Sequence, residues 1–250
     1  MSLPLLSFLF ALVALIYSSV GFGGGSTYTA LLALSGADYR VVPVIALLCN
    51  IIVVTGGCVR FWRAGLIDWR AMMPLLIVSA PLAFLGGMVP LKEATFFLVL
   101  GGALLLSALA LFVPAARLPR KRLALPIMMA LSGAIGLLAG LSGIGGGIFM
   151  APLLHLVRWA EARRIAAFAS VYILINSITG VAGQISKTGS ASLADTASSY
   201  WTLLLAVFVG GQIGSYLGLR LLSPIYLRWL TALLVAYVAV RLVIKGLWPG

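Results

Sequence analysis

The chain opens with a stretch that reads LPLLSFLFALVALIYSSVGFGGGSTYTALLALS, at Leu3–Ser35. Its two apolar parts are separated by GFGGG at Gly21–Gly25, and glycine is a poor helix former. As one continuous helix, these 33 residues would extend about 50 Å, whereas the hydrocarbon core of a bilayer is about 30 Å thick. The stretch therefore predicts a membrane helix that breaks at the glycines and is followed by a short second helix.

The same pattern returns in the second half of the chain. Gly143–Gly147 reads GIGGG, 122 residues after Gly21–Gly25. Two more landmarks follow each copy in the same order. The first is an asparagine, Asn50 in the first half and Asn176 in the second. The second is a row of small residues four apart, which are Ser79, Ala83 and Gly87 in the first half and Gly210, Gly214 and Gly218 in the second. Three landmarks in one order indicate an internal duplication, which is the usual ancestry of secondary transporters.

The composition predicts that lipid surrounds the chain. Of the residues, 62% are hydrophobic and 9% are charged, and the mean hydropathy is +1.16, whereas soluble domains carry about a quarter charged residues. Two short apolar stretches follow the glycine motifs, at Thr27–Ser35 and Ile148–Val157. Eight longer runs cross, or nearly cross, a bilayer: Leu3–Val20, Val41–Val59, Ala71–Leu91, Thr95–Val113, Leu123–Leu141, Ile165–Ile185, Trp201–Leu221 and Ile225–Ile244. We therefore predict an all-α integral membrane protein of about eight hydrophobic segments.

A basic linker divides the chain near its middle. Residues 114–122 read PAARLPRKR and separate a first transmembrane repeat, residues 1–113, from a second, residues 123–250. Each repeat contains four of the eight predicted segments. A second polar stretch, Ser186–Tyr200, is rich in small residues and predicts a flexible surface loop.

The distribution of Lys and Arg distinguishes two ways in which the glycine-broken units can bend. If each unit crosses the membrane once, the 17 basic residues divide as 10 and 7 between the two sides; if each unit is a hairpin that returns to its own side, they divide as 12 and 5. Cytoplasmic loops carry an excess of Lys and Arg, so the hairpin arrangement is favoured. It makes the two repeats inverted relative to each other, with both termini outside and the linker in the cytoplasm.

The basic residues do not indicate a nucleic-acid partner. The net charge is +12, but most of these residues sit at the ends of predicted membrane helices, where they fix topology and contact lipid head groups. Cys49 and Cys58 fall on opposite faces of one predicted helix and cannot bridge each other. With no CxxC motif and no histidine cluster, we expect neither a metal site nor a cofactor.

The glycine motifs also predict a binding site. In the hairpin arrangement, short helices begin near Ser26 and Ile148, and their free N–H groups and positive dipole ends converge near the middle of the membrane. Such a place suits an anion. The alternative is that the glycines only permit close helix contacts, but their duplication favours a site. The predicted substrate-binding residues are Gly23, Gly24, Gly25, Ser26, Thr27, Asn50, Ser142, Gly145, Gly146, Gly147, Ile148 and Asn176.

Polar side chains within the apolar runs extend this prediction. Asn50 and Asn176 are able to donate hydrogen bonds to an oxyanion without a buried charge, or to link helices. No carboxylate lies within an apolar run, which points away from cation transport and towards a small anionic substrate. The further candidates for proton or substrate contact are His155, Tyr172, Gln184 and Gln212.

In its two glycine motifs and paired asparagines, the chain resembles the sulfite exporter TauE/SafE family of bacterial anion permeases. The second copy, GIGGGIFMAP at Gly143–Pro152, fits the family pattern of GxGGG followed shortly by proline, whereas the first copy has Ala30 where that proline would fall. The resemblance implies a multi-pass protein of the bacterial cytoplasmic (inner) membrane. It also implies transport, usually outward, of sulfite, an organosulfonate or another sulfur oxyanion.

Two other functions remain open at this point. One is a passive anion channel. The other is an intramembrane serine protease, because Gly140–Gly143 spells GLSG and His155 would serve Ser142 as a base. Ser142 corresponds to Val20 in the first copy, whereas the adjacent glycines are duplicated, so a transporter is favoured over an enzyme. The sequence does not decide between a monomer and a homodimer.

Overall fold

The computed structural model describes residues 1–19, 21–112, 123–157, 159–217 and 224–247, and all regular structure in them is helical. The first half contains α1 (Leu3–Ser19), α2 (Gly25–Ser35), α3 (Val42–Arg63), α4 (Trp69–Met88) and α5 (Glu93–Phe112). The second half contains α6 (Leu125–Ser142), α7 (Gly147–Leu156), α8 (Ala162–Thr188), α9 (Ser190–Ser199), α10 (Trp201–Leu217) and α11 (Pro224–Leu247).

These helices confirm the predicted all-α class. The eight long apolar runs correspond to α1, α3, α4, α5, α6, α8, α10 and α11, and the two short stretches after the glycine motifs correspond to α2 and α7. Within the described residues, four helices are long and apolar enough to cross a membrane, namely α3, α4, α6 and α8, while α1, α10 and the described part of α5 are apolar but shorter. The predicted linker at residues 114–122 lies outside the described residues.

The sequence prediction was wrong for Ser186–Tyr200. Instead of a flexible loop, α8 continues to Thr188, Gly189 interrupts the helical path with φ +86°, and α9 occupies Ser190–Ser199. Alanine and leucine in this segment favour a helix, and one glycine with a left-handed φ is enough to separate two helices without unfolding either.

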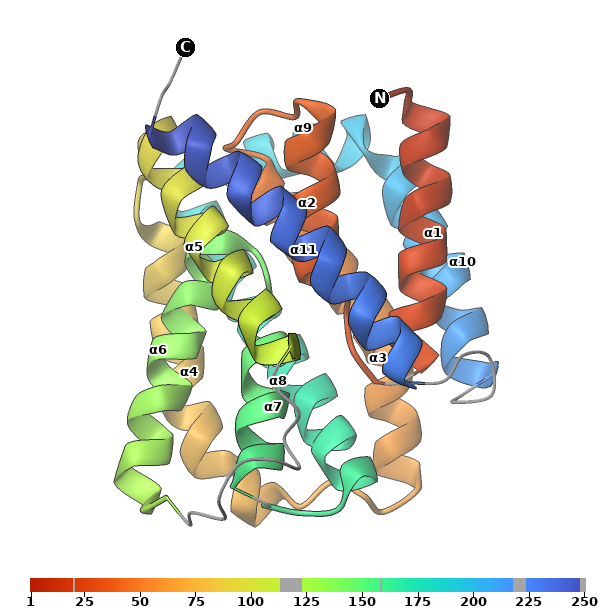
Figure 1. Cartoon of the computed structure of the whole chain (residues 1–250), viewed down its shortest axis with the longest axis vertical. Coiled ribbons are helices and arrows are strands. Elements are labelled where there is room, and N and C mark those ends of the chain that lie inside the picture. The colour runs from red at the N-terminus through yellow and green to blue at the C-terminus, as the bar shows by residue number, and fades with distance from the viewer. Residues whose placement is uncertain (20, 113–122, 158, 218–223, 248–250) are drawn as a thin grey trace.

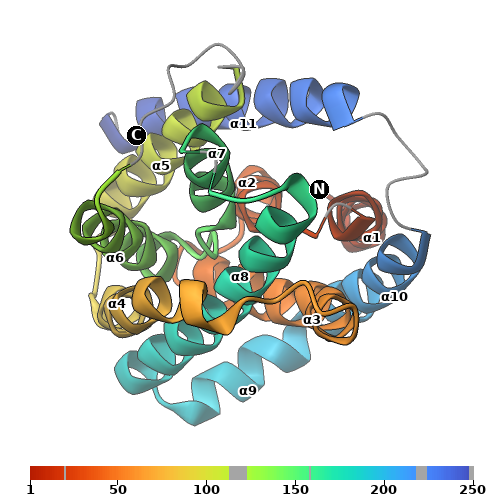
Figure 2. The same cartoon turned by 90° about the horizontal axis from the view of Figure 1, so that it is seen from below.

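Helices α3 and α8 form the centre of the molecule. They run antiparallel. In each of them, 67% of the most apolar 18-residue stretch is buried inside the protein. Helix α10 packs beside α3 and α4 beside α8, while α1 lies along α10 and α6 along α4. Helices α5 and α11 pack against each other in antiparallel directions (Figure 1). The view from below shows that they lie along one edge of the bundle (Figure 2).

The two glycine-broken units turn back on themselves (Figure 1). We call the end where α1 begins and α11 finishes the upper end, and the end where α3 leads into α4 the lower end. Helix α1 descends from the upper end, and α2 returns to it at Gly36–Val41. Helix α6 rises from the lower end, and α7 returns towards it. Neither unit passes from one end to the other as a single straight rod.

Small residues let the flanking helices approach closely. Gly140 on α6 faces the backbone of Ala83 on α4, and Gly136 faces the backbone of Ser79, with no room for a Cβ at either glycine. On the other flank, Gly210 and Gly214 of α10 meet the backbone of Ala11 and Leu15 on α1 in the same way, whereas Gly218 lies outside the described residues. Close backbone contact of this kind supplies the van der Waals contact that holds membrane helices together.

The outer surface of this bundle is apolar. Large hydrophobic side chains on separate helices point outward, among them Phe8 at 65% exposure on α1 and Ile77 at 61% on α4. Exposing so much apolar surface to water is unfavourable, whereas contact with lipid tails is not. The bundle therefore has the outer surface of a multi-pass membrane protein.

We expect Gly140→Ala to lower the melting temperature of the purified protein in detergent, because the new methyl group would push α6 away from the backbone of α4. The matched control is Gly102→Ala on α5, where a Cβ would meet nothing within 4 Å. That change should be neutral or stabilising, since alanine is favoured over glycine in a helix by about 1 kcal/mol. Equal melting temperatures for the two variants would contradict this account of α4 and α6.

Candidate functional site

Glycines with positive φ angles make both breaks. Gly21 and Gly24 in the first loop have φ of +84° and +85°, and Gly145 and Gly146 in the second have φ of +82° and +79°. Residues with a Cβ rarely adopt this conformation, so the sequence permits these turns only because it supplies glycine. Gly24 and Gly146 are the N-cap residues of α2 and α7, and neither helix receives a hydrogen bond from a capping side chain. The first N–H groups of both helices are thus left without an acceptor in their own helix.

The two loops come together beside the centre of α3. The amide of Asn50 donates a hydrogen bond from Nδ2 to the carbonyl oxygen of Ile144, at 3.2 Å. Gly25, at the start of α2, lies so close to that carbonyl and to Asn50 that no side chain would fit there. We call this meeting point the glycine junction and define it by Gly23, Gly25, Asn50, Ile144, Gly145, Gly147, Ile173 and Ser177.

Five of the predicted site residues therefore lie together in the glycine junction: Gly23, Gly25, Asn50, Gly145 and Gly147. The sequence prediction missed Ile173 and Ser177. A Cβ on Gly145 would lie 3.2 Å from both Ile173 Cγ2 and Ser177 Oγ, so these α8 residues form the wall opposite Asn50. Ser177 follows Ser170 by two helical turns, and this weak periodic signal within an apolar helix was the only indication in the sequence.

Asn176 occupies a different position from Asn50. Its Nδ2 donates to the carbonyl oxygen of Tyr172 one turn earlier in α8, at 2.9 Å, so it does not bridge to a glycine loop as Asn50 does. Its Oδ1 is buried and has no hydrogen-bond partner among the described residues. The same helix contacts α4 and α6 on either side of Asn176: Gly183 meets the backbone of Phe84 and Gly87, and the Tyr172 hydroxyl donates to the carbonyl oxygen of Ser132.

Two of the predicted hydroxyl groups, those of Thr27 and Ser142, have partners near their own breaks. Thr27 Oγ1 and the Tyr17 hydroxyl are 3.0 Å apart. Ser142 Oγ donates to the carbonyl oxygen of Leu138 at 2.6 Å and accepts from the N–H of Ile144 at 3.4 Å. The other predicted residues flank the junction. Ser26 is buried in the first turn of α2, and Ile148 is half-buried in the first turn of α7. Gly24 lies against Val13 and Tyr28, and Gly146 lies against Ile135 and the Tyr172 ring.

Two of the further candidates lie apart from the junction. His155 is exposed in the last turn of α7, eight residues and about 12 Å along the axis from Gly147. It is therefore separated from Ser142 by the length of α7, which disfavours the Ser142–His155 protease dyad. Gln212 lies on α10 against Gly56 of α3, beside Arg60.

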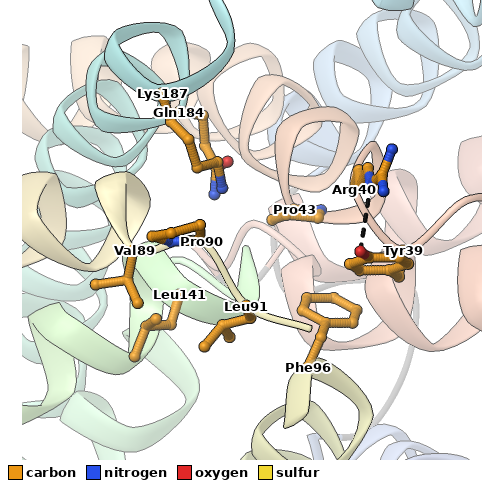
Figure 3. A pocket seen from close by; sticks show the side chains of 10 residues that line it. All are labelled: Tyr39, Arg40, Pro43, Val89, Pro90, Leu91, Phe96, Leu141, Gln184 and Lys187. Atoms are coloured by element: carbon orange, nitrogen blue, oxygen red, sulfur yellow. Dashed lines mark hydrogen bonds between the residues drawn. The ribbon is translucent and has the colours of Figure 1, made fainter. Parts of the chain in front are cut away.

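The remaining candidate, Gln184, lines a cavity at the upper end. The cavity has a volume of about 340 Å³ and is bounded by the start of α3, the connection between α4 and α5, the end of α6 and the end of α8 (Figure 3). Its lining residues are Tyr39, Arg40, Pro43, Val89, Pro90, Leu91, Phe96, Leu141, Gln184 and Lys187. Gln184 donates from Nε2 to the carbonyl oxygen of Gly140 at 3.4 Å, and Pro43 abuts Gly143, so the cavity floor rests against the second glycine loop.

The lower side of the junction is filled instead. A Cβ on Gly21 would lie 3.1 Å from the ring of Phe61 and 3.2 Å from Ser170 Oγ. The Ser170 hydroxyl donates to the carbonyl oxygens of Gly21 and Ala166. The aromatic ring and this hydrogen bond together hold the first glycine loop against α3 and α8.

Metal-binding groups do not gather anywhere in the described part of the chain. No three His, Cys, Asp or Glu side chains come together there. Cys49 and Cys58 are buried as free thiols on α3. The chemistry at the glycine junction is that of peptide N–H groups, amides and hydroxyls.

Two antiparallel central helices, two helical units that turn back at glycine loops, and a junction of broken helices inside an apolar bundle are typical of polytopic membrane transporters. Comparison with known proteins places the protein more closely: the chain belongs to the sulfite exporter TauE/SafE family, whose pattern matches residues 6–242.

Known relatives agree with this assignment. The chain is 33% identical to the probable membrane transporter protein y4hK of Sinorhizobium fredii over 243 residues, which cover 95% of this chain and 96% of the relative. It is 27% identical to a probable membrane transporter protein of Haemophilus influenzae over 109 residues, 42% of this chain and 41% of that protein. No solved structure matches the chain.

We expect Asn50→Leu to destabilise the protein more than Asn176→Leu. The first change removes the side-chain donor to the buried Ile144 carbonyl, and an unsatisfied buried group costs about 1–3 kcal/mol. The second removes an amide that donates only within its own helix. Both asparagines carry a buried Oδ1 without a partner in the described chain, so this oxygen does not distinguish them. Melting temperatures in detergent measure the difference, and an equal loss in both variants would be inconsistent with the bridging role of Asn50.

Proposed function

We propose that this protein is a secondary transporter that moves a small anion, sulfite or an organosulfonate, outward across the cytoplasmic membrane by alternating access. The observation that carries the proposal is the glycine junction, where α2 and α7 begin without a capping side chain. Helix N-termini present free N–H groups and a partial positive charge, both of which attract an anion.

The distribution of acidic residues supports an anionic substrate. All five carboxylates of the chain, Asp38, Asp68, Glu93, Glu161 and Asp195, lie in connections, at helix starts or in α9. Helices α3 and α8, which wall the junction, contain no carboxylate. A cation would therefore find no counter-charge at the junction, whereas an anion finds amide and hydroxyl donors.

The helix pairings support two inverted repeats. Each helix of the first half corresponds to one of the second: α1 to α6, α2 to α7, α3 to α8, α4 to α10 and α5 to α11. When corresponding helices are exchanged, the packed pair α1–α10 becomes the packed pair α6–α4, and the central pair α3–α8 stays the same. Helices α1 and α6 start from opposite ends of the molecule (Figure 1). Alternating access in many transporters uses such a pair of repeats around one central site.

The basic residues support an orientation with the lower end in the cytoplasm. Only five of the 17 Lys and Arg residues, Arg40, Lys92, Lys187, Arg241 and Lys245, belong to the upper end in the hairpin arrangement. The excess at the lower end satisfies the positive-inside rule. In this orientation the upper cavity faces the exterior, and Phe61 closes the cytoplasmic side.

The test is a flux assay with the purified protein in proteoliposomes, against a panel of sulfur oxyanions, sulfonates and carboxylates, with and without a pH gradient. We expect saturable transport of sulfite or a sulfonate. An ohmic anion current without saturation would instead indicate a passive channel. Absence of flux for every anion in the panel would refute the proposal.

Gly25→Ala should reduce this flux at least tenfold, because the methyl group would displace the Ile144 carbonyl and Asn50 from the junction. Gly102→Ala, where a Cβ meets nothing within 4 Å, should transport normally. Both proteins are to be reconstituted at equal amounts, with monodispersity checked by size-exclusion chromatography. Normal flux through a well-folded Gly25→Ala protein would remove the junction from the transport path.

Phe61 is proposed as the cytoplasmic gate, and its removal should expose Ser170. In a protein whose two cysteines are replaced by alanine, a Ser170→Cys thiol should react slowly with an impermeant maleimide from the cytoplasmic side, since Ser170 is fully buried. Adding Phe61→Ala should raise that rate at least tenfold, whereas adding the lipid-facing change Phe8→Ala should not. An unchanged rate with Phe61→Ala would mean that Phe61 does not seal this side.

A further inference from the structure

The upper cavity contains two cationic side chains and no acidic one. Arg40 precedes α3, and Lys187 lies in the last turn of α8. Neither of them forms an ion pair with a described residue. Two carboxylates lie near Arg40, and their charges act on its guanidinium without forming an ion pair with it. Asp38 accepts the backbone N–H of Arg40, and Glu93 pairs with Lys245 at 3.7 Å. The cationic groups of the cavity are therefore available to a ligand.

The two cations come from different walls (Figure 3). Lys187 and Gln184 extend from α8 towards the cavity on one side, and Arg40 stands with Tyr39 on the other, with Pro43 and Pro90 between them. Arg40 is positioned by Tyr39, since its Nε donates to the Tyr39 hydroxyl at 3.2 Å, and this hydrogen bond raises the pKa of Arg40. A guanidinium and an ammonium that line one cavity from different walls suit an oxyanion, because both groups donate hydrogen bonds to it.

The cavity is also suitably placed and sized. Its volume of about 340 Å³ lies within the range of about 300–1,000 Å³ that is common for small-molecule sites. Its lining residue Pro43 abuts Gly143, and Gln184 donates to the carbonyl oxygen of Gly140. The cavity therefore lies next to the second glycine loop, which contributes Ile144 and Gly145 to the glycine junction.

The residues that correspond to Lys187 and Gln184 in the first half are not polar cavity residues. The offset of 126 residues that relates Asn50 to Asn176 relates Lys187 to Phe61 and Gln184 to Cys58. At the lower end the aromatic ring of Phe61 packs against Gly21, where a cationic group would stand if the two ends were alike. The positive charge that Lys187 adds to the upper cavity is thus specific to the second half and does not follow from the repeat.

We propose that the upper cavity is an outer anion site, in which Lys187 and Arg40 bind the exported oxyanion between its release from the glycine junction and its escape to the exterior. This site rests on the proposed function for the identity of its ligand. Lys187 contributes an ammonium and Arg40 a guanidinium that is hydrogen-bonded to Tyr39, while Gln184 donates to the carbonyl oxygen of Gly140.

A charge-sensitive thiol label tests the site without relying on transport. Val89 lines the cavity and is 41% exposed, so Val89→Cys in the cysteine-free background provides the reporter. The rates to compare are those of the anionic sulfonatoethyl and the cationic trimethylammonioethyl methanethiosulfonates. We expect the anionic reagent to be favoured, and Lys187→Gln to lower the ratio about threefold to tenfold, as expected for one unit charge a few ångströms away. Lys92→Gln, at the same end but outside the lining, should leave the ratio unchanged.

Protection by an anion completes the experiment. Isethionate, a sulfonate that does not attack the label, should slow modification of Val89→Cys, and this protection should disappear in the Arg40→Gln, Lys187→Gln double variant. A ratio that is insensitive to Lys187, a similar change with Lys92→Gln, or no protection at all would overturn the outer site. Protection without flux in the proteoliposome panel would support the anion site and refute the transporter, so the two failures are distinguishable.

Discussion

The hydrogen bond from Asn50 to the Ile144 carbonyl is the interaction on which the centre of this protein depends. Inside a membrane, every peptide group outside a regular helix needs a hydrogen-bond partner from the protein. Water is absent there, and each unsatisfied group costs several kcal/mol. Breaking two helices at one depth exposes several such groups at once. Asn50 satisfies one of them from a neighbouring helix, and it ties a loop of the second half to a helix of the first. The remaining N–H groups at the starts of α2 and α7 form the electropositive surface that the proposed function uses.

Such a junction requires rigid surroundings, and the small-residue contacts of the flanking helices provide them. Helices α4 and α6, like α1 and α10, meet backbone to backbone at glycines, so the broken units are clamped along their intact partners. The central helices α3 and α8 are enclosed between these pairs (Figure 2). The strain of the breaks is thus confined to two loops, while the helices on either side remain regular.

The parts of this arrangement that the sequence predicted are those set by local chemistry. Triple glycines specify a break wherever they occur in an apolar helix, and an amide in such a helix needs a partner, so both loops and Asn50 were accessible to prediction. Ile173 and Ser177 were not, because an isoleucine and a serine in an apolar helix are ordinary until the fold shows what faces them. Asn176 looked equivalent to Asn50, yet its amide turns to its own helix. The upper cavity joins residues from four separate parts of the chain, and α9 was mistaken for a loop because small polar residues are common to both.

Helix α1 finds its main partner, α10, nearly two hundred residues later in the chain. During synthesis α1 enters the membrane first, and the face that will contact α10 stays against lipid until the second half has been made. The first half therefore cannot complete its tertiary structure on the ribosome, and assembly of the bundle is a late, concerted event.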